Sequence, residues 1–132
     1  MKKNILESKW GEDALLMGWT SIPSSLLFLQ SDLHISANSM NVLLHLVMHW
    51  WDDKRKPHPS QQSIAKRMGV SIRTVQRAIY ELEESGLLLK QTTSKDHPVY
   101  RGRNLYDLSP LIATLQTMTP MKKEQVQKKK ED

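Results

Sequence analysis

Four side chains suited to DNA recognition fall at helical spacing in the middle of the chain. Arg73, Gln76, Arg77 and Tyr80 are separated by one, three or four positions, so a helix would present them on one face. Arg can bond guanine, and Gln can bond adenine, through two hydrogen bonds at base edges in the major groove. The spacing therefore predicts a recognition helix over about residues 71–85.

Local signals predict the elements that would position this helix. Four of its apolar residues are expected to face the core: Val75, Ala78, Ile79 and Leu82. Ser71 is suited to cap its N-terminus. A shorter helix is predicted just upstream, from a Ser60 cap to Met68, with Gly69 ending it. Two helices joined by residues 69–71 form a helix-turn-helix.

An earlier amphipathic helix of about four turns is predicted to follow Ser36, another suitable cap. Five large apolar residues at helical spacing define its buried stripe: Met40, Leu43, Leu44, Val47 and Trp51. We therefore expect Trp51 to pack in the core, in preference to the alternative that Trp50 and Trp51 form a base-stacking site. A short strand over residues 19–22 is expected before this helix.

The residues after Gly86 predict a β-hairpin. A strand over 87–92 is followed by a polar loop and a returning strand over 99–108, broken by Gly102. Basic side chains flank its turn: Lys95, His97, Arg101 and Arg103. Ser109 and Pro110 then cap and begin a last short helix, which Thr119 and Pro120 are expected to end.

This order of elements predicts a mainly α fold with a small β-hairpin. It is a winged helix-turn-helix, with a three-helix core, a wing over about residues 87–108, and extra N- and C-terminal elements. The length of 132 residues fits one such domain with tails. We expect an N-terminal arm or short helix at 1–17, the DNA-binding domain at 18–118, and a lysine-rich, disordered tail at 119–132.

Positive charge is concentrated where the helix-turn-helix is predicted. Residues 54–80 hold seven Lys and Arg and no Asp or Glu, whereas residues 1–53 hold three basic and six acidic residues. The whole chain has a net charge of +5. A basic block in an otherwise acidic region favours a phosphate-binding surface, with a solvated basic surface as the alternative. The run Lys54-Arg55-Lys56 would contact phosphate or form an exposed turn.

The predicted DNA-binding residues lie on both helices of the motif and on the wing. Hydroxyl and backbone N–H groups at the two helix N-termini can hold phosphates as well as cap. Tyr80 either contacts DNA or packs against the wing. The wing residues either reach the minor groove or backbone, or form a solvated loop. The full set is Ser60, Gln61, Ser71, Arg73, Thr74, Gln76, Arg77, Tyr80, Lys95, Arg101 and Arg103.

A family resemblance supports this assignment. The stretch PSQQSIAKRMGVSIRTVQRAIYELEESGLL, residues 59–88, resembles winged helix-turn-helix proteins of phage and plasmid genes and the DNA-binding domain of GntR-type regulators. Residues 19–23, WTSIP, and the helix around 43–47 resemble the N-terminal domain of phage O-type replication proteins. The resemblance covers roughly residues 19–112 and implies a winged helix that binds DNA.

Other chemistries find less support. His45 and His49 have the spacing of a zinc pair, but Leu46 stands where a zinc protease needs Glu, and there is no cysteine for a structural site. Asp52 and Asp53 could form the acidic pair of a metal-dependent nuclease, but adjacent residues at a helix end are expected to point in different directions, and no third ligand is apparent. We therefore expect no enzyme activity, no catalytic residue, no metal and no cofactor. Without an apolar span or a secretory signal, a soluble cytoplasmic protein is expected.

The sequence thus predicts a sequence-specific binder of double-stranded DNA that acts as a small transcriptional regulator. Two alternatives stay open: a phage or plasmid replication-initiation protein that binds an origin, and a winged helix that binds protein. A homodimer is a candidate state, with contacts expected from residues 1–17 and from the helix after Ser109. Replication or transcription proteins are candidate partners, and no membrane association is expected.

Overall fold

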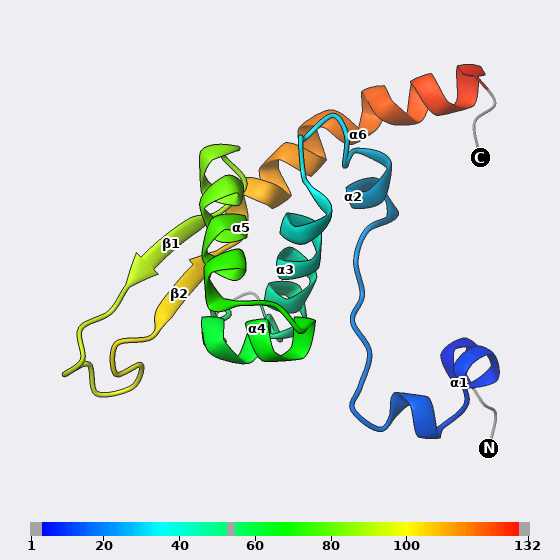
Figure 1. Ribbon diagram of the computed structural model, residues 1–132. Helices are drawn as coiled ribbons and strands as arrows, with labels where there is room; N and C mark the ends of the chain where they lie inside the picture. The colour runs from blue at the N-terminus through cyan, green and yellow to red at the C-terminus, as the bar shows by residue number, and fades with distance from the viewer. Residues whose placement is uncertain (1–3, 53–54, 130–132) are drawn as a thin grey trace.

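Six α-helices and one two-stranded hairpin make up the computed structural model, which describes residues 4–52 and 55–129 (Figure 1). The elements are α1 (Ile5–Trp10), the 3-10 turn η1 (Asp13–Leu15), α2 (Ser24–Phe28), α3 (Ala37–Met48), α4 (Gln61–Met68), α5 (Ile72–Glu84), β1 (Leu89–Thr92), β2 (Asn104–Asp107) and α6 (Ser109–Lys129). The mainly helical fold with a hairpin wing confirms the predicted fold class. Expectations for residues 1–3 of the arm, for Asp53 and Lys54, and for the tail at 130–132 lie outside the described residues.

Serine caps and a left-handed glycine set the helix-turn-helix where the sequence predicts it. The backbone N–H of Ser63 donates to Ser60 Oγ at 3.0 Å, and that of Thr74 donates to Ser71 Oγ at 3.1 Å. Between the helices, Gly69 has φ = +71°, a conformation that would strain a residue with a side chain. The resulting turn lets α5 pack against both α3 and α4.

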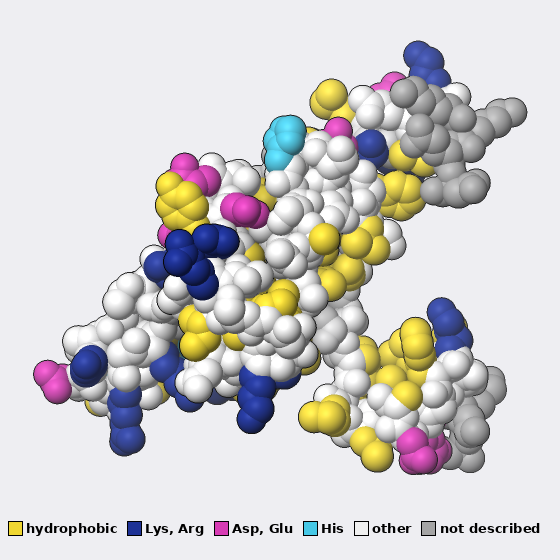
Figure 2. All heavy atoms as spheres, viewed as in Figure 1, with side chains coloured by type: hydrophobic (Ala, Val, Ile, Leu, Met, Phe, Trp, Pro, Cys, Tyr) yellow, Lys and Arg dark blue, Asp and Glu magenta, His cyan; other side chains and the backbone are white. Residues whose placement is uncertain are grey.

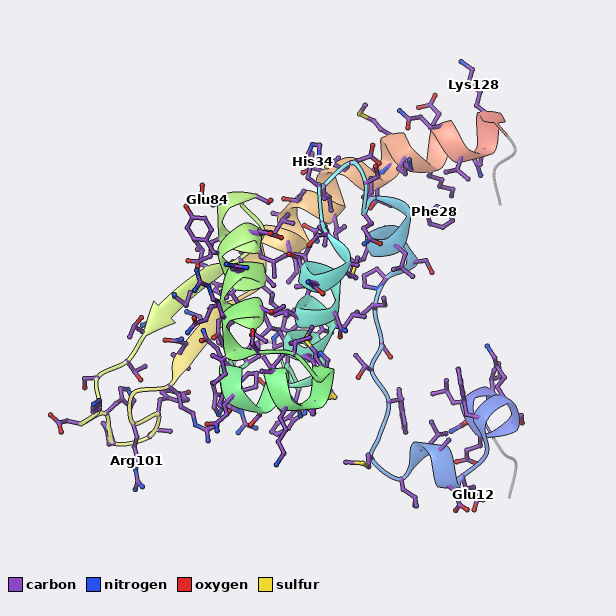
Figure 3. The ribbon with its side chains drawn as sticks, in the orientation of Figure 1. Glu12, Phe28, His34, Glu84, Arg101 and Lys128 are labelled. Carbon is purple, nitrogen blue, oxygen red and sulfur yellow. The ribbon has the colours of Figure 1, made fainter. Side chains whose placement is uncertain are left out.

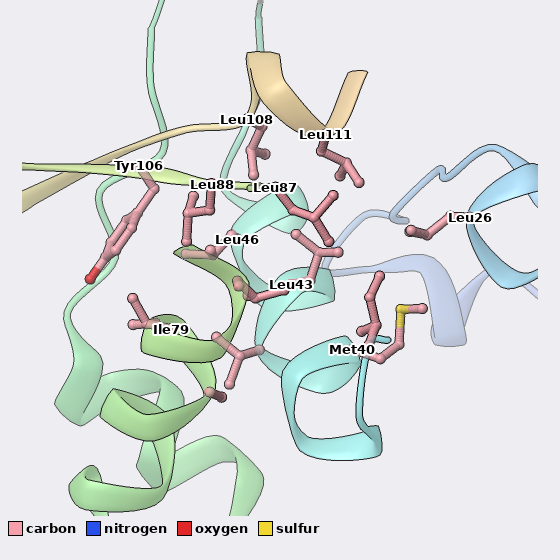
Figure 4. Close-up of a cluster of buried hydrophobic side chains, with 14 of the residues drawn as sticks. Leu26, Met40, Leu43, Leu46, Ile79, Leu87, Leu88, Tyr106, Leu108 and Leu111 are labelled. Atoms are coloured by element: carbon pink, nitrogen blue, oxygen red, sulfur yellow. The ribbon is translucent and has the colours of Figure 1, made fainter. Parts of the chain in front are cut away.

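Leucine-rich packing between α3, α5 and the base of the wing forms the core (Figure 4). The apolar residues of α5 are buried as predicted: Val75, Ala78, Ile79 and Leu82. The same cluster contains Leu43 and Leu46 of α3, Leu87 and Leu88 before β1, and Leu111 of α6. Because burial contributes about 25 cal/mol per Å² of apolar surface, this cluster holds α5 with only its polar face in solvent.

A small polar cluster ties the second half of α5 to the start of α3. Oε2 of Glu81 accepts hydrogen bonds from Ser39 Oγ at 2.7 Å and from Ser36 Oγ at 3.1 Å. Ser39 is only 1% exposed, so its hydroxyl must find its partners inside the protein. Ser36 also caps α3, as predicted. The cluster therefore fixes the orientation of α5 relative to α3.

The strands of the wing are shorter than the sequence suggests. β1 and β2 pair antiparallel with Lys90 opposite Tyr106, and the expected strand starts at residues 87 and 99 are wrong. Leu87 and Leu88 enter the core instead. Residues 93–103 form a loop, because the backbone N–H groups of Val99 and Tyr100 both donate to His97 Nδ1. Arg101 and Gly102 then take positive φ, which ends any extended conformation.

α3 ends earlier than predicted, and this moves Trp51 out of the core. The helix stops at Met48, so helical spacing no longer connects Trp51 with Leu44. Trp51 is 77% exposed, while Trp50 packs against the core cluster. The prediction of a buried Trp51 is wrong because the chain leaves the helical path before reaching it.

The N-terminal residues form an arm that projects from the body (Figure 1). α1 and η1 pack on each other, and residues 18–23 lead as irregular chain to α2. The strand expected at residues 19–22 is wrong, since the described strands β1 and β2 pair only with each other. The large apolar side chains of the arm are between 63% and 101% exposed: Ile5, Trp10, Leu16 and Met17.

α6 is much longer than predicted. It continues through Pro120 to Lys129, so the expected end at Thr119 and Pro120 is wrong, as is the expected disorder of residues 119–129. Pro120 removes one helical hydrogen bond. The Thr119 hydroxyl donates to the Leu115 carbonyl, and Lys122 pairs with Asp32 at 3.2 Å, which holds the second half of α6 to the body.

Asp107, and not the predicted Ser109, caps the start of α6. The backbone N–H of Ser109 donates to Asp107 Oδ1 at 2.9 Å, so Ser109 is the first helical residue and not the cap. This bond and one from the Ser109 hydroxyl hold the pKa of Asp107 below its usual value. Although α6 has 21 residues, neither it nor another helix of the described chain is long and apolar enough to cross a membrane.

Candidate nucleic-acid interface

One face of α5 carries the four residues predicted to read DNA. Arg73, Gln76, Arg77 and Tyr80 are all exposed. Tyr80 is 62% exposed, so most of its ring is in solvent. None of the four side chains makes a hydrogen bond or ion pair with another described residue. Their donors and acceptors are therefore available to a ligand.

Hydroxyl groups gather at the N-termini of both helices of the motif. Ser71 Oγ and Thr74 Oγ1 lie 3.0 Å apart at the start of α5, and Ser60 Oγ donates to Ser63 Oγ at 2.7 Å at the start of α4. These hydroxyls serve as caps and also lie at the positive ends of the two helix dipoles. Both helix starts therefore suit phosphate oxygens.

Gln61 is the predicted site residue that the structure ties most closely to the fold. Its Nε2 donates to the hydroxyl of Tyr106 at 3.2 Å, and Tyr106 is 0% exposed. The backbone N–H of Tyr106 in turn donates to the Pro57 carbonyl at 2.9 Å. These bonds join the start of α4 to β2. The side-chain amide of Gln61 therefore positions α4 against the wing.

The wing carries the remaining predicted residues. Lys95, Arg101 and Arg103 are all exposed. Figure 3 shows Arg101 at the far end of the wing, away from the core. Arg103 lies closer to the motif, because its Nη1 donates to the His58 carbonyl at 3.4 Å, just before α4. Arg103 therefore connects the basic side chains of the wing with the start of α4.

Lys and Arg predominate on α5 and on the wing. Figure 2 shows them there, with acidic side chains toward the end of α5, where Figure 3 labels Glu84, and at the tip of the wing, where Asp96 follows Lys95. Lys66 and Arg67 of α4 are also exposed. Neither was among the predicted contacts, although their place in the acid-free stretch 54–80 was a signal. The arrangement fits a polyanionic ligand.

His49 is a partner of Arg67. Its Nε2 accepts a hydrogen bond from Arg67 Nη2 at 3.1 Å. Burial and then the charge of Arg67 lower the pKa of His49, which keeps the ring neutral and able to accept. His45 Nδ1 bonds instead to the Asn41 carbonyl at 2.8 Å. Within residues 4–52 and 55–129, no group of three metal-binding side chains comes together.

Comparison with known protein families matches residues 33–88 to the model of a helix-turn-helix domain. The matched segment contains α3, α4, α5 and the two leucines before β1, and stops short of the wing. A comparison with curated proteins gave no match. The chain therefore carries a helix-turn-helix domain, which indicates DNA binding. The closer resemblance to GntR-type and phage O-type proteins stays a prediction.

Proposed function

We propose that this protein binds double-stranded DNA at specific sequences, with α5 in the major groove. The proposal rests above all on the exposed face of α5. Its two arginines and its glutamine lie in the first half of the helix and have no internal partner among the described residues. In a recognition helix these positions meet base edges. Arg73 and Arg77 would bond guanine, and Gln76 would bond adenine.

The other predicted residues would hold the DNA backbone. Ser60 and Gln61 at the start of α4, and Ser71 and Thr74 at the start of α5, offer hydroxyl or backbone N–H groups to phosphates. Tyr80 would reach the backbone or a base from the end of the reading face. Lys95, Arg101 and Arg103 would let the wing follow the neighbouring backbone or minor groove. Such contacts fix the register in which α5 reads the bases.

The cellular role we propose is that of a small transcriptional regulator. A protein that occupies a specific site beside a promoter changes transcription by occupancy or by contact with transcription proteins. Replication initiation is the second candidate, because origin binding would use the same α5 surface. The location of the target site, at a promoter or at an origin, discriminates the two roles.

We also propose that the chain forms a homodimer through its N-terminal arm. The arm exposes four large apolar side chains, and their burial in an interface would contribute about 25 cal/mol per Å² of apolar surface. A groove between α2 and the second half of α6 is lined by Phe28, Val126 and Lys123. The arm also carries Glu7, Glu12 and Asp13. The arm of a second copy would therefore fit this groove by apolar contact and by charge.

Light scattering after size exclusion tests the dimer. The full chain is expected to elute as a dimer, and Phe28→Asp, which places a charge in the groove, is expected to shift it to monomer. Val99→Asp is the matched control, because it places the same charge at an exposed apolar residue of the wing, outside the arm and the groove. A monomeric wild type at high protein concentration would contradict the dimer.

Fluorescence anisotropy with a labelled duplex carrying a selected site tests DNA binding by α5. Arg73→Ala and Arg77→Ala are each expected to weaken binding by ~1–3 kcal/mol. Lys9→Ala loses the same charge far from α5 and is expected to stay near wild type. Wild-type affinity in both arginine variants would refute the role of α5. No DNA binding at all would favour the alternative of a protein-interaction module.

A further inference from the structure

A pocket beside the start of α4 brings an exposed aromatic ring next to two arginines. Its volume is about 220 Å³, and its lining includes His49, Trp51, His58, Ser60, Arg67 and Arg103. No described residue of the lining is acidic. A flat ring beside cationic and hydroxyl groups matches the chemistry of a nucleotide, which has a base that stacks and a phosphate that is anionic.

The indole of Trp51 is available for stacking. Trp51 is 77% exposed, although tryptophan is highly buried on average. The ring of His49 lies 6.2 Å away, centroid to centroid, and is tilted by 44°, so the two rings are not stacked. A face of the indole is therefore open to a planar ligand.

Two arginines are held at the same pocket by single hydrogen bonds. Arg67 donates to His49 Nε2 at 3.1 Å, and Arg103 donates to the His58 carbonyl at 3.4 Å. Each guanidinium carries five N–H donors, so both keep donors for a phosphate. Ser60 adds the positive end of the α4 dipole on the same side.

The open ring favours an unpaired nucleotide. In duplex DNA the bases stack on one another and present only their edges in the grooves, so no base face is available to Trp51. The pocket is also smaller than the roughly 300–1,000 Å³ typical of drug-sized ligands. Its size suits a single nucleotide better than a longer stacked segment.

We propose that this pocket binds one unpaired nucleotide of DNA, with the base stacked on Trp51 and the phosphate held by Arg67 and Arg103. The inference rests on the proposed function, because Ser60 and Arg103 belong to the proposed duplex interface and bring DNA to the pocket. The protein would then hold the junction at which a bound duplex opens or ends.

Titration of the full chain with two labelled probes tests the proposal. One probe is a blunt duplex with a selected site. The other is the same duplex with a single-stranded thymidine overhang at each of its two ends. Wild type is expected to bind the overhang probe at least fivefold more tightly. Fivefold is the lower end of ~1–3 kcal/mol per stacked base at 1.4 kcal/mol per tenfold. Its tryptophan fluorescence is expected to fall on binding.

The readout for each variant is the ratio of its two affinities, so that general effects on duplex binding cancel. Trp51→Ala and Arg67→Gln are expected to lose the gain from the overhang, whereas Trp51→Phe keeps a ring and most of the gain. Trp10→Ala is the matched control, since Trp10 is exposed but lies on the arm, outside the pocket, and any effect through the proposed dimer would change both affinities and leave their ratio unchanged. Arg73→Ala is expected to weaken both probes equally.

Two results would overturn the inference while duplex binding stands: equal wild-type affinity for the two probes, or a full gain in a folded Trp51→Ala variant. Failure of the proposed function looks different, because wild type would then not bind the blunt duplex. Binding of a thymidine single strand alone, lost in Trp51→Ala, would support the pocket even in that case.

Discussion

Replacement of Glu81 by Ala tests how α5 is held in place relative to α3. The Glu81 carboxylate accepts bonds from Ser39 at 2.7 Å and from Ser36 at 3.1 Å. A hydrogen bond to a charged group contributes ~1.5–3 kcal/mol, and the exposure of Glu81 to solvent lowers this value. The buried Ser39 hydroxyl would keep its contact with the Ser36 hydroxyl at 3.1 Å, but its own proton would have only the Ala78 carbonyl, at 3.4 Å, as acceptor. We expect a loss of about 2 kcal/mol in the free energy of unfolding.

Thermal and urea unfolding followed by circular dichroism measure this loss. At about 4 °C per kcal/mol for a domain of this size, Tm would fall by roughly 8 °C. Glu84→Ala is the matched control, because Glu84 lies on the same helix and has no partner among the described residues. Its effect is expected to stay within about 0.5 kcal/mol. Equal stability of the two variants would refute the anchoring of α5 by Glu81.

Three other perturbations have outcomes that follow from the structure. The backbone N–H of Ser109 and then its hydroxyl lower the pKa of Asp107, so its contribution to stability is present above about pH 3.8 and is lost as the pH falls through the folded pKa. Asp107→Asn should therefore flatten the acid limb of the stability curve, and an unchanged curve would contradict this. Burial, and next the charge of Arg67, lower the pKa of His49, so the free energy of unfolding should fall as the pH drops below about 6.5. This fall should be smaller in His49→Gln, and denaturant titrations at several pH values can measure it. Replacement of Lys128, Lys129 and Lys130 by Gln, which leaves Lys122, Lys123 and Val126 in place, should weaken DNA binding mainly at low salt. Unchanged low-salt affinity would exclude a phosphate-binding role for these three lysines.

The helix-turn-helix could be predicted because its signals are local and agree with one another. Ser60 and Ser71 cap helices through side chains that bond three residues ahead. Gly69 takes the left-handed conformation that ends α4. The apolar period of α5 matches its buried face residue by residue. Each of these features depends only on near neighbours in the sequence.

The remainder of the fold depends on contacts between distant residues. The sequence shows apolar spacing as far as Trp51 but not the end of α3 at Met48. Pro120 suggests a helix end, yet an ion pair from Lys122 to Asp32 far along the chain accompanies the continued helix. Local patterns carry no information about such partners.

The candidate interface likewise has one part that follows from local sequence and another that depends on contacts between distant residues. The reading face of α5 follows from helical spacing alone. The bond between Gln61 and the buried Tyr106, and the grouping of Trp51 with Arg67 and Arg103, join separate elements and become visible only in three dimensions.

Selection of bound sequences from a random duplex DNA pool at moderate salt tests the central claim most directly. If α5 reads the major groove, the wild-type protein will enrich a defined motif containing guanine and adenine positions. Arg77→Ala will then lose base preference at one position of that motif and keep the others. A wild type that enriches no motif, or variants at Arg73 and Arg77 that enrich the wild-type motif unchanged, would contradict sequence recognition by α5.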